Sequence, residues 1–414
     1  MAQLKYIPSI IEQYVDEIPF LYIYRKNAAI SPSYLLNELA EIDERLDAHV
    51  TGLLMIGSSA WELCEEELSF DRPEELFTLS LVAIKLNDQK KLEALIQELE
   101  EEEQLDAVAD ALVYFPFEQV KLLLTELYKN PSPKVQYIVV RAFRLHGQKS
   151  ERLVQHALSS ESPLVKREAI LKIGTLGMSN LLSLTAPFMD DEDEGVAFAA
   201  MWTATRFGNL SALQKLESFV SHPRYGDQAL QYVVMQKDVN RTTEILRALF
   251  AEEATKRLSI LGLGYAGKAN AITPLIALMD VPESARVAGE AFSLLTGIDV
   301  AANSLDREAP EGFEAGPTES PDDEDVELDP DEDLPWPDSQ KIDVWWKHNQ
   351  QNYFSDKRYI WGQELSAESL KNVLRHGNQR QRLFAANVSA LYDRDHPLFN
   401  VQAKVKQQKS FLSH

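Results

Sequence analysis

The sequence predicts an all-α protein built as an α-solenoid, a stack of helical hairpins closed by a helical cap at either end. Two segments that open with Ser-Pro, at Ser132 and Ser162, follow the same course about 30 residues apart, and a blurred third copy opens with acidic residues. The copies close with Gly147, Gly177 and Gly208. Internal repeats at this spacing are typical of solenoids.

Each copy is expected to fold as two helices. A polar start caps the first helix, an apolar pattern at helical spacing follows, and the glycine allows a turn with positive φ. Two helices and their turns fill such a unit, and neither can bury its apolar face without neighbours. Extending the period predicts about eight hairpins in a repeat solenoid over residues 71–300. Asn87 replaces the glycine in the first of these copies, the second ends near Phe115, and Gly267 and Gly297 resume the series.

Residues 1–70 do not carry the repeat and are predicted to form an N-terminal helical cap. A helical pattern runs over residues 33–50, with acidic side chains on the face opposite to the apolar one. A second helix is expected over residues 58–68. The apolar face of the first is formed by Leu35, Leu39, Ile42, Leu46 and Val50.

The charge balance favours a protein partner over a nucleic acid. The chain of 414 residues has a formal net charge of -24, which repels nucleic acid backbones and anionic membranes and favours basic proteins. A single cysteine, Cys64, cannot form an intramolecular disulfide, which fits a reducing compartment. The sequence shows no signal segment, and no apolar run approaches the roughly 18 residues that span a bilayer. We therefore expect a cytoplasmic protein.

Residues 301–340 are predicted to be an acidic flexible linker. Between Asp306 and Asp333 there are 14 acidic residues and one basic residue, a net charge of -13, with four prolines and few large apolar side chains. Such a composition does not favour a packed core, so its removal is expected to leave the melting temperature nearly unchanged. The segment is either a soluble spacer or a surface for a basic partner. The candidate partner-binding residues in it are Asp322, Asp323, Glu324 and Asp325.

A C-terminal helical unit is expected over residues 341–414, where 12 basic and six acidic residues give a net charge of +6. Ser366 is placed to cap a helix. Aromatic side chains around Trp345 and Trp361 either cover the end of the solenoid core or, with Arg375, Arg380 and Arg382, form a nucleic-acid surface. The first interpretation is favoured because a terminal repeat must cover its apolar face.

Basic residues also gather in the central copies of the repeat. They are ordinarily solvated surface side chains, but if one helix of each hairpin faced a partner, some of them would line one groove. The candidate partner-binding residues of this group are Arg141, Arg144, Lys166 and Arg167.

No motif predicts catalysis, a cofactor or a metal site. The sequence contains no glycine-rich phosphate loop, HExxH, CxxC or nucleophile elbow. The stretch from Gly262 to Gly267 matches GxGxxG by its letters, but it follows a helical pattern instead of a strand. We therefore expect a protein that is not an enzyme.

Two stretches resemble a proteobacterial family of HEAT-like repeat proteins. They are residues 39–64, with the sequence LAEIDERLDAHVTGL followed by AWELC, and the C-terminal group Trp345-Trp346, Arg358–Gln363 and Arg380–Arg382. Members of that family are often encoded near type VI secretion genes, and the family has no established catalytic residues. The resemblance implies HEAT-like hairpins and a role with secreted effectors.

Three hypotheses follow from the residues and the resemblance together. The first is a protein-binding scaffold that acts as an immunity protein and neutralises a type VI secretion effector. The second is an adaptor or chaperone that loads such an effector. A third, of another class, is nucleic-acid binding by the basic central copies and the C-terminal unit.

Overall fold

The computed structural model describes residues 7–313, 316 and 329–413. In this part the chain folds as an all-α, solenoid-like repeat, with one two-stranded sheet of β1 (Tyr359–Ile360) and β2 (Gln363–Glu364). Its contacts divide the chain into two compact units. Unit 1 comprises Met1–Ala29, Asn37–Ala212 and Asp393–Phe411, and unit 2 comprises Ile30–Leu36, Leu213–Tyr392 and Leu412–His414.

Eight helices begin at intervals of 27 to 32 residues within the fully described stretch 73–296. Each opens one copy of the repeat, and we call these eight the first helices. Their spacing follows the predicted period and their number equals that of the predicted copies, but no second helix follows the last of them within residues 297–300. They are α4 (Pro73–Lys85), α6 (Glu102–Tyr114), α8 (Pro133–Leu145), α10 (Pro163–Leu176), α11 (Glu194–Arg206), α13 (Gly226–Gln236), α15 (Glu253–Ala266) and α17 (Pro282–Thr296).

A second helix follows most first helices. These are α5 (Gln89–Glu98), α7 (Phe117–Leu127), α9 (Glu151–Leu158), α12 (Leu210–Leu216), α14 (Val239–Ala251) and α16 (Ile272–Leu278). The fourth hairpin differs, because a 3-10 helix, η1 (Ser179–Asp190), replaces its second α-helix. Pro187 within η1 cannot donate the backbone hydrogen bond of a regular helix.

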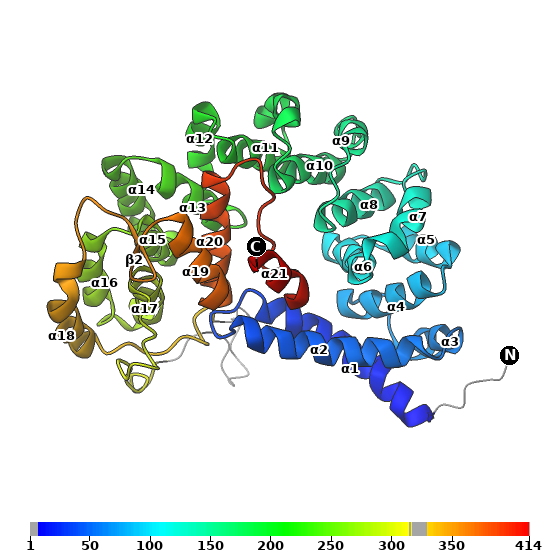
Figure 1. Ribbon diagram of the computed structural model, residues 1–414, viewed down its shortest axis with the longest axis horizontal. Helices are drawn as coiled ribbons and strands as arrows, with labels where there is room; N and C mark the ends of the chain where they lie inside the picture. The colour runs from blue at the N-terminus through cyan, green and yellow to red at the C-terminus, as the bar shows by residue number, and fades with distance from the viewer. Residues whose placement is uncertain (1–6, 314–315, 317–328, 414) are drawn as a thin grey trace. The chain divides into compact units, whose positions relative to one another are not determined.

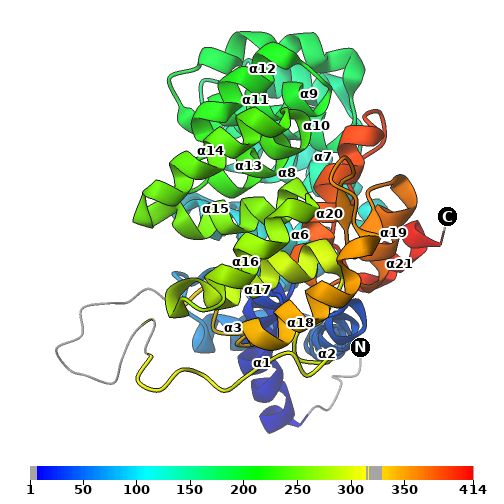
Figure 2. The same ribbon diagram turned by 90° about the vertical axis from the view of Figure 1, so that its left-hand side faces the viewer.

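The first helices stack against one another and form the core. In unit 1 each of α4, α6, α8, α10 and α11 packs on the next, and in unit 2 α13 packs on α15 and α15 on α17 (Figures 1 and 2). In α11 every side chain from Gly195 to Arg206 is buried. Since a buried Val, Leu or Ile stabilises a fold by about 1.5–3 kcal/mol, this stacking is the main source of stability in each unit.

The ends of the first helices confirm the glycine pattern. The five expected glycines all have positive φ, and Asn87 adopts φ 53° at the end of the first copy. The starts follow the sequence as well. Four first helices begin with proline, and Asp193 caps α11 by accepting a hydrogen bond from the amide of Val196 at 2.9 Å. These residues therefore set the length of each first helix.

Three helices precede the repeats, two of them near the helices expected over residues 33–50 and 58–68. They are α1 (Pro8–Ala28), α2 (Leu36–Leu54) and α3 (Ser59–Glu67). Four of the five residues of the predicted apolar face of α2 are buried, and Leu35, which lies before the helix, is 44% exposed. In unit 1, α1 packs on α4, so it covers the apolar face of the first repeat.

Unit 2 continues after α17 with α18 (Ser339–Asn349), the β1–β2 hairpin, α19 (Ala367–His376) and α20 (Gln379–Tyr392). The Ser366 side chain accepts a hydrogen bond from the amide of Ser369 and caps α19 as predicted. The ring of Trp345 meets that of Phe292 of α17 edge to face, with centroids 5.5 Å apart. Trp345 thus packs on α17, the final helix of the stack. This agrees with the interpretation that aromatic side chains cover the end of the solenoid core.

The region predicted as a C-terminal unit, 341–414, is divided between the two units. Residues up to Tyr392 pack within unit 2, whereas Asp393–Phe411, with most of α21 (Val405–Leu412), packs within unit 1. Composition could not reveal this division, because a basic segment carries no periodic signal that identifies its neighbours.

The two flanks of the acidic segment pair with each other. The amide of Arg307 donates to the carbonyl of Trp336 at 2.9 Å, and the amide of Asp338 donates to the carbonyl of Leu305 at 2.8 Å. Residues 307 and 336 therefore lie side by side, so the two described flanks of the acidic segment meet.

In the described end of the acidic segment, Asp331 is buried in unit 2, whereas Pro330, Glu332 and Asp333 are exposed. Asp331 is 6% exposed, and Asp329 and Asp331 form ion pairs with Arg286 and Arg257. Removing residues 306–333 would leave these arginines without their partners. We therefore expect this deletion to lower the melting temperature, in contrast to what the composition alone suggests.

Gly177→Ala should cost more stability than Gly147→Ala. Both glycines have positive φ, 63° and 70°, so each substitution carries the roughly 1–2 kcal/mol of left-handed strain. A Cβ at Gly177 would lie 2.5 Å from the carbonyl oxygen of Asp395, whereas a Cβ at Gly147 would meet nothing within 4 Å. Urea unfolding should show a loss of about 1 kcal/mol for Gly147→Ala and at least twice that for Gly177→Ala. Equal losses would contradict the close approach of Asp395.

Candidate binding surfaces

Arg141 and Arg144, predicted as partner-binding residues, lie on α8 and pair with acidic side chains of the adjacent first helices. The Arg141 guanidinium lies 3.0 Å from Asp106 of α6 and 3.3 Å from Glu168 of α10. Arg144 makes two hydrogen bonds to Glu168, at 2.6 and 2.8 Å. The structure therefore places both arginines in an ion-pair network that links three first helices.

Lys166 and Arg167 of α10 also have partners within unit 1. Arg167 contacts Glu102 at 2.5 Å, and the ammonium of Lys166 lies 3.8 Å from Asp191. The side chains of the four predicted basic residues are only 11% to 19% exposed. They connect neighbouring repeats, and little of their surface is open to another protein.

Glu168 is the centre of this network. Its side chain is 1% exposed, and burial alone would raise the pKa of its carboxyl. The surrounding guanidinium groups of Arg144 and Arg141 have the opposite effect and lower that pKa to about 2. Nearby, burial lowers the pKa of Lys172 to about 7, and its ammonium donates to the carbonyl of Gln148. Because the pKa of the Glu168 carboxyl is about 2, this carboxylate is ionised at neutral pH.

A second surface of unit 1 holds an extended segment of the same chain, residues 393–405, called the C-terminal strap below. It passes the C-terminal ends of α10 and α11, where the amide of Leu398 donates to the carbonyl of Thr175 at 2.7 Å. Arg206 of α11 donates to the carbonyls of Gly174 and, at 2.5 Å, of His396. Buried arginine and backbone carbonyls thus recognise the main chain of an extended peptide.

The far end of the C-terminal strap lies against the opening helices of unit 1, next to α21 (Figure 1). Arg25 of α1 donates to the carbonyls of Gln402 and Ala403 at 2.6 and 2.8 Å. The Lys404 ammonium pairs with Asp47 at 2.7 Å and lies 3.4 Å from the ring centroid of Tyr114. Unit 1 therefore binds this segment through main-chain contacts at several points.

Unit 2 holds an extended segment of its own at the ends of its first helices. The guanidinium of Arg358 donates to the carbonyls of Val234 and Ala266 at 2.9 and 3.1 Å. The amide of Tyr359 donates to the carbonyl of Gly267 at 2.7 Å, and that of Trp361 to the carbonyl of Leu294 at 2.7 Å. An arginine and main-chain amides thus satisfy the carbonyls at the ends of α13, α15 and α17.

A third docked segment lies in an arginine cluster of unit 2, which we define as Arg257 of α15, Arg286 of α17 and Arg380 of α20. Arg257 binds the carboxylate of Asp331 with hydrogen bonds of 2.7 to 3.2 Å. Arg286 contacts the carboxylate of Asp329 at 2.5 Å and donates to the carbonyl of Asp331 at 2.9 Å.

The third arginine of the cluster contacts the residue between these two aspartates. Arg380 donates to the carbonyl of Pro330 at 2.9 Å and pairs with Glu290 of α17 at 3.0 Å. Three consecutive residues, 329–331, are therefore each contacted by at least one guanidinium. Sequence reasoning missed this site, because the contacting residues lie 43 to 74 positions apart and follow no period.

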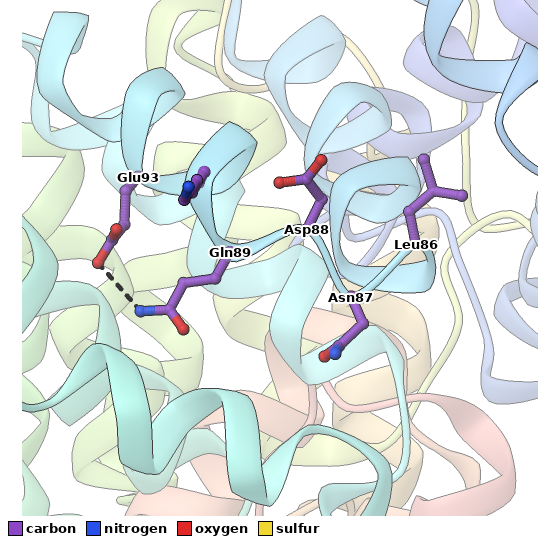
Figure 3. Close-up of a pocket in the computed structure, with 6 residues that line it drawn as sticks. Leu86, Asn87, Asp88, Gln89 and Glu93 are labelled. Carbon is purple, nitrogen blue, oxygen red and sulfur yellow. Dashed lines mark hydrogen bonds between the residues drawn. The ribbon is translucent and has the colours of Figure 1, made fainter.

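A pocket lies at the turn between α4 and α5 (Figure 3). Its polar groups take part in the local fold. Asp88 caps α5 by accepting from the amide of Lys91, and the Glu93 carboxylate accepts from Gln89 at 3.2 Å and from Asn130 at 3.0 Å. These contacts give no arrangement of acid, base or nucleophile around the pocket.

The remaining predicted residues have different outcomes. Asp322, Asp323, Glu324 and Asp325 lie outside the described residues. Of the arginines considered for nucleic acid, Arg382 is fully buried and Arg375 donates to the carbonyl of Leu412 at 3.1 Å.

The described residues meet the requirements of neither a metal site nor a membrane-spanning helix. No group of three or more of their His, Cys, Asp or Glu side chains is arranged to hold a metal ion. In the same part of the chain no helix combines the length and apolarity needed to cross a membrane.

Replacing Glu168 by glutamine should destabilise unit 1. The change leaves Arg141 and Arg144 buried next to a neutral amide, and removing one partner of a buried ion pair costs about 3–5 kcal/mol. Glu126→Gln is the matched control, since Glu126 pairs with Lys129 at the surface with 53% of its side chain exposed and should cost under about 1 kcal/mol. Urea unfolding at pH 7 measures both losses, and equal losses would contradict the role of Glu168.

The pH dependence gives an independent check on Glu168. Its pKa in the folded state, about 2, lies below the ordinary value of 4.5. The stabilisation is therefore present above pH 4.5 and is lost as the pH falls through about 2. The difference in unfolding free energy between the unaltered chain and Glu168→Gln should shrink over this window. A difference that stays constant down to pH 2 would show that the carboxylate charge contributes nothing.

Comparison with known proteins agrees with the repeat architecture. Residues 150–232 match the family model of HEAT repeats, and this segment contains α9, α10, η1, α11, α12 and the first part of α13. No curated protein matches the chain. The match covers well under half of the sequence, and it supports a HEAT-like repeat protein, in agreement with the stacked hairpins.

Proposed function

We propose that the chain is a non-enzymatic scaffold that recognises a partner protein through the surfaces of its helical repeats. The observation that carries this proposal is that the repeats already hold three non-helical segments of the chain itself. These are the C-terminal strap on unit 1, and residues 358–361 and 329–331 on unit 2. Guanidinium groups and helix-end carbonyls make the contacts, and both can bind the main chain of another protein equally well.

The specific role that we propose is that of a cytoplasmic immunity protein for a type VI secretion effector. An adaptor or chaperone that loads the effector is the alternative. Support comes from the resemblance of residues 39–64 and of the C-terminal group to proteins encoded near such secretion genes. Repeats of this type commonly serve as scaffolds for protein interaction, which fits either role.

The acidic residues Asp322, Asp323, Glu324 and Asp325 remain proposed contacts for a basic partner. The proposal rests on the sequence alone, in which 14 acidic residues gather between Asp306 and Asp333. Contacts between exposed charges fade over about 10 Å at 0.1 M salt. If these residues bind the partner, its affinity must therefore weaken as the salt concentration rises.

Purification of the tagged full chain from its native cells should recover one stoichiometric partner. The purified pair then allows a direct measurement of affinity. Replacing the four acidic residues by Asn or Gln should lower that affinity, most strongly at low salt, because screening already weakens the contacts at high salt. Recovery of general chaperones alone would contradict the scaffold function.

Gene deletion separates the two specific roles. Cells that still make the effector should stop growing or grow slowly when an immunity protein is lost. Loss of an adaptor should leave growth unchanged and stop delivery of the effector. Normal growth together with normal delivery would contradict both roles.

A further inference from the structure

The arginine cluster of unit 2 is built as a binding site for an acidic peptide. Its guanidinium groups come from three separate helices and converge on one short segment, Asp329-Pro330-Asp331. They contact both carboxylates and two main-chain carbonyls of this segment. The segment forms a turn, in which the amides of Asp331 and Glu332 donate to the side chain and the carbonyl of Asp329 at 2.9 and 3.3 Å. Contacts to carboxylate and main chain together select an acidic peptide and not an isolated anion.

The cluster is strongly positive when the segment is set aside. Two of its three guanidinium groups, those of Arg380 and Arg257, then share the carboxylate of Glu290 at 3.0 and 3.8 Å. Asp227 is the next acidic group, and its carboxylate already accepts hydrogen bonds from Tyr265 and Gln231. A partly buried guanidinium group without a carboxylate partner destabilises the fold. The cluster therefore requires acidic residues from a segment outside α15, α17 and α20.

Aromatic rings hold Arg286 in place. Its guanidinium lies 4.7 Å from the ring centroid of Trp336 and 5.5 Å from that of Phe313. Such stacking fixes the plane of the guanidinium group. The site is therefore organised in advance for its ligand.

The docked segment is attached to the fold by contacts that do not involve the cluster. The pairing of residues 305 and 307 with residues 338 and 336 closes the base of the loop. At the other end of the segment, the hydroxyls of Ser31 and Ser33 contact Asp333 at 3.2 Å. Because both ends are held by other contacts, release of residues 329–331 from the arginines does not require the helices of unit 2 to separate.

We propose that the arginine cluster is a docking site for an acidic segment of a partner protein in a turn conformation, with a proline between two carboxylates, and that Asp329–Asp331 is its competing internal occupant. The inference rests on the scaffold function, for which it names one site and the chemistry of the ligand. An occupant on the same chain has an effective concentration of the order of mM. A partner segment therefore binds well only when it contacts the cluster more extensively than residues 329–331 do.

The test uses a fluorescent peptide of residues 327–335 and the full chain. Asp331→Asn weakens the internal occupant without changing an arginine, so the peptide should bind this variant about tenfold more tightly than the unaltered chain, measured by fluorescence anisotropy. Glu332→Gln is the matched control, because it removes one charge from the same loop at an exposed residue. It should leave peptide affinity unchanged.

Two further variants establish that the peptide occupies the arginine cluster. A peptide with Asn at positions 329 and 331 should not bind, and Arg286→Gln added to Asp331→Asn should abolish binding. If Asp331→Asn does not fold, Asp329→Asn serves instead, since its carboxylate contacts Arg286 alone among the arginines of the cluster.

Equal peptide affinity for Asp331→Asn and the unaltered chain would overturn the docking site. So would binding of the neutral peptide, or binding that survives Arg286→Gln. Failure of the peptide test with recovery of a stoichiometric partner from cells leaves the scaffold function intact. Peptide binding without any cellular partner leaves the site in place and removes the support for the scaffold function.

Discussion

The packing of first helices against one another is the interaction on which the rest of each unit depends. A helix such as α11, buried from Gly195 to Arg206, has no solvated face on which to place a charge. Any arginine or carboxylate that it carries must find a partner on a neighbouring element, because an unpaired buried charge costs several kcal/mol. The helix ends obey the same rule, since their last carbonyls lack partners within the helix.

The two units satisfy this rule in different ways. In unit 1 the arginines of α8 take their partners from the adjacent first helices, so that Asp106 and Glu168 complete the network. In unit 2 the equivalent charges are balanced by a loop, through Asp329 and Asp331. Helix-bound partners cannot leave without unfolding the stack, whereas a loop can exchange with another peptide. For this reason the arginine cluster of unit 2, and not the basic residues of α8 and α10, is the better candidate for a partner.

The stack of hairpins could be predicted because the residues that begin and end each copy recur about every 30 positions in the sequence. The closing glycines and Asn87 mark left-handed helix ends, and the apolar patterns mark the first helices. The ion pairs of unit 1 also follow the repeat in part. Arg141 and Glu168 are 27 positions apart, which is about one repeat. Residues one period apart lie side by side in a stack, so opposite charges at that spacing predict a pair.

The contacts made by the segments outside the repeats could not be predicted from the repeat period. The C-terminal strap and the acidic loop bind at positions far away in the sequence, as Arg206 and His396 do across 190 residues. Contacts of this kind depend on how the chain returns to an existing surface, which neither composition nor period encodes. The 3-10 helix of the fourth hairpin is similar, because a proline such as Pro187 interrupts a regular helix without specifying the conformation that replaces it.

The central claim is that the repeats hold extended peptide segments through their helix ends. Amide hydrogen exchange of the full chain, resolved by residue, tests it most directly. The amides of Leu398, Tyr359 and Trp361 donate to the carbonyls of Thr175, Gly267 and Leu294. They should therefore exchange about as slowly as amides within α10 and α17, since opening requires release of the docked segment. Exchange of all three at the rate of an unfolded chain, while the helices remain protected, would contradict the claim.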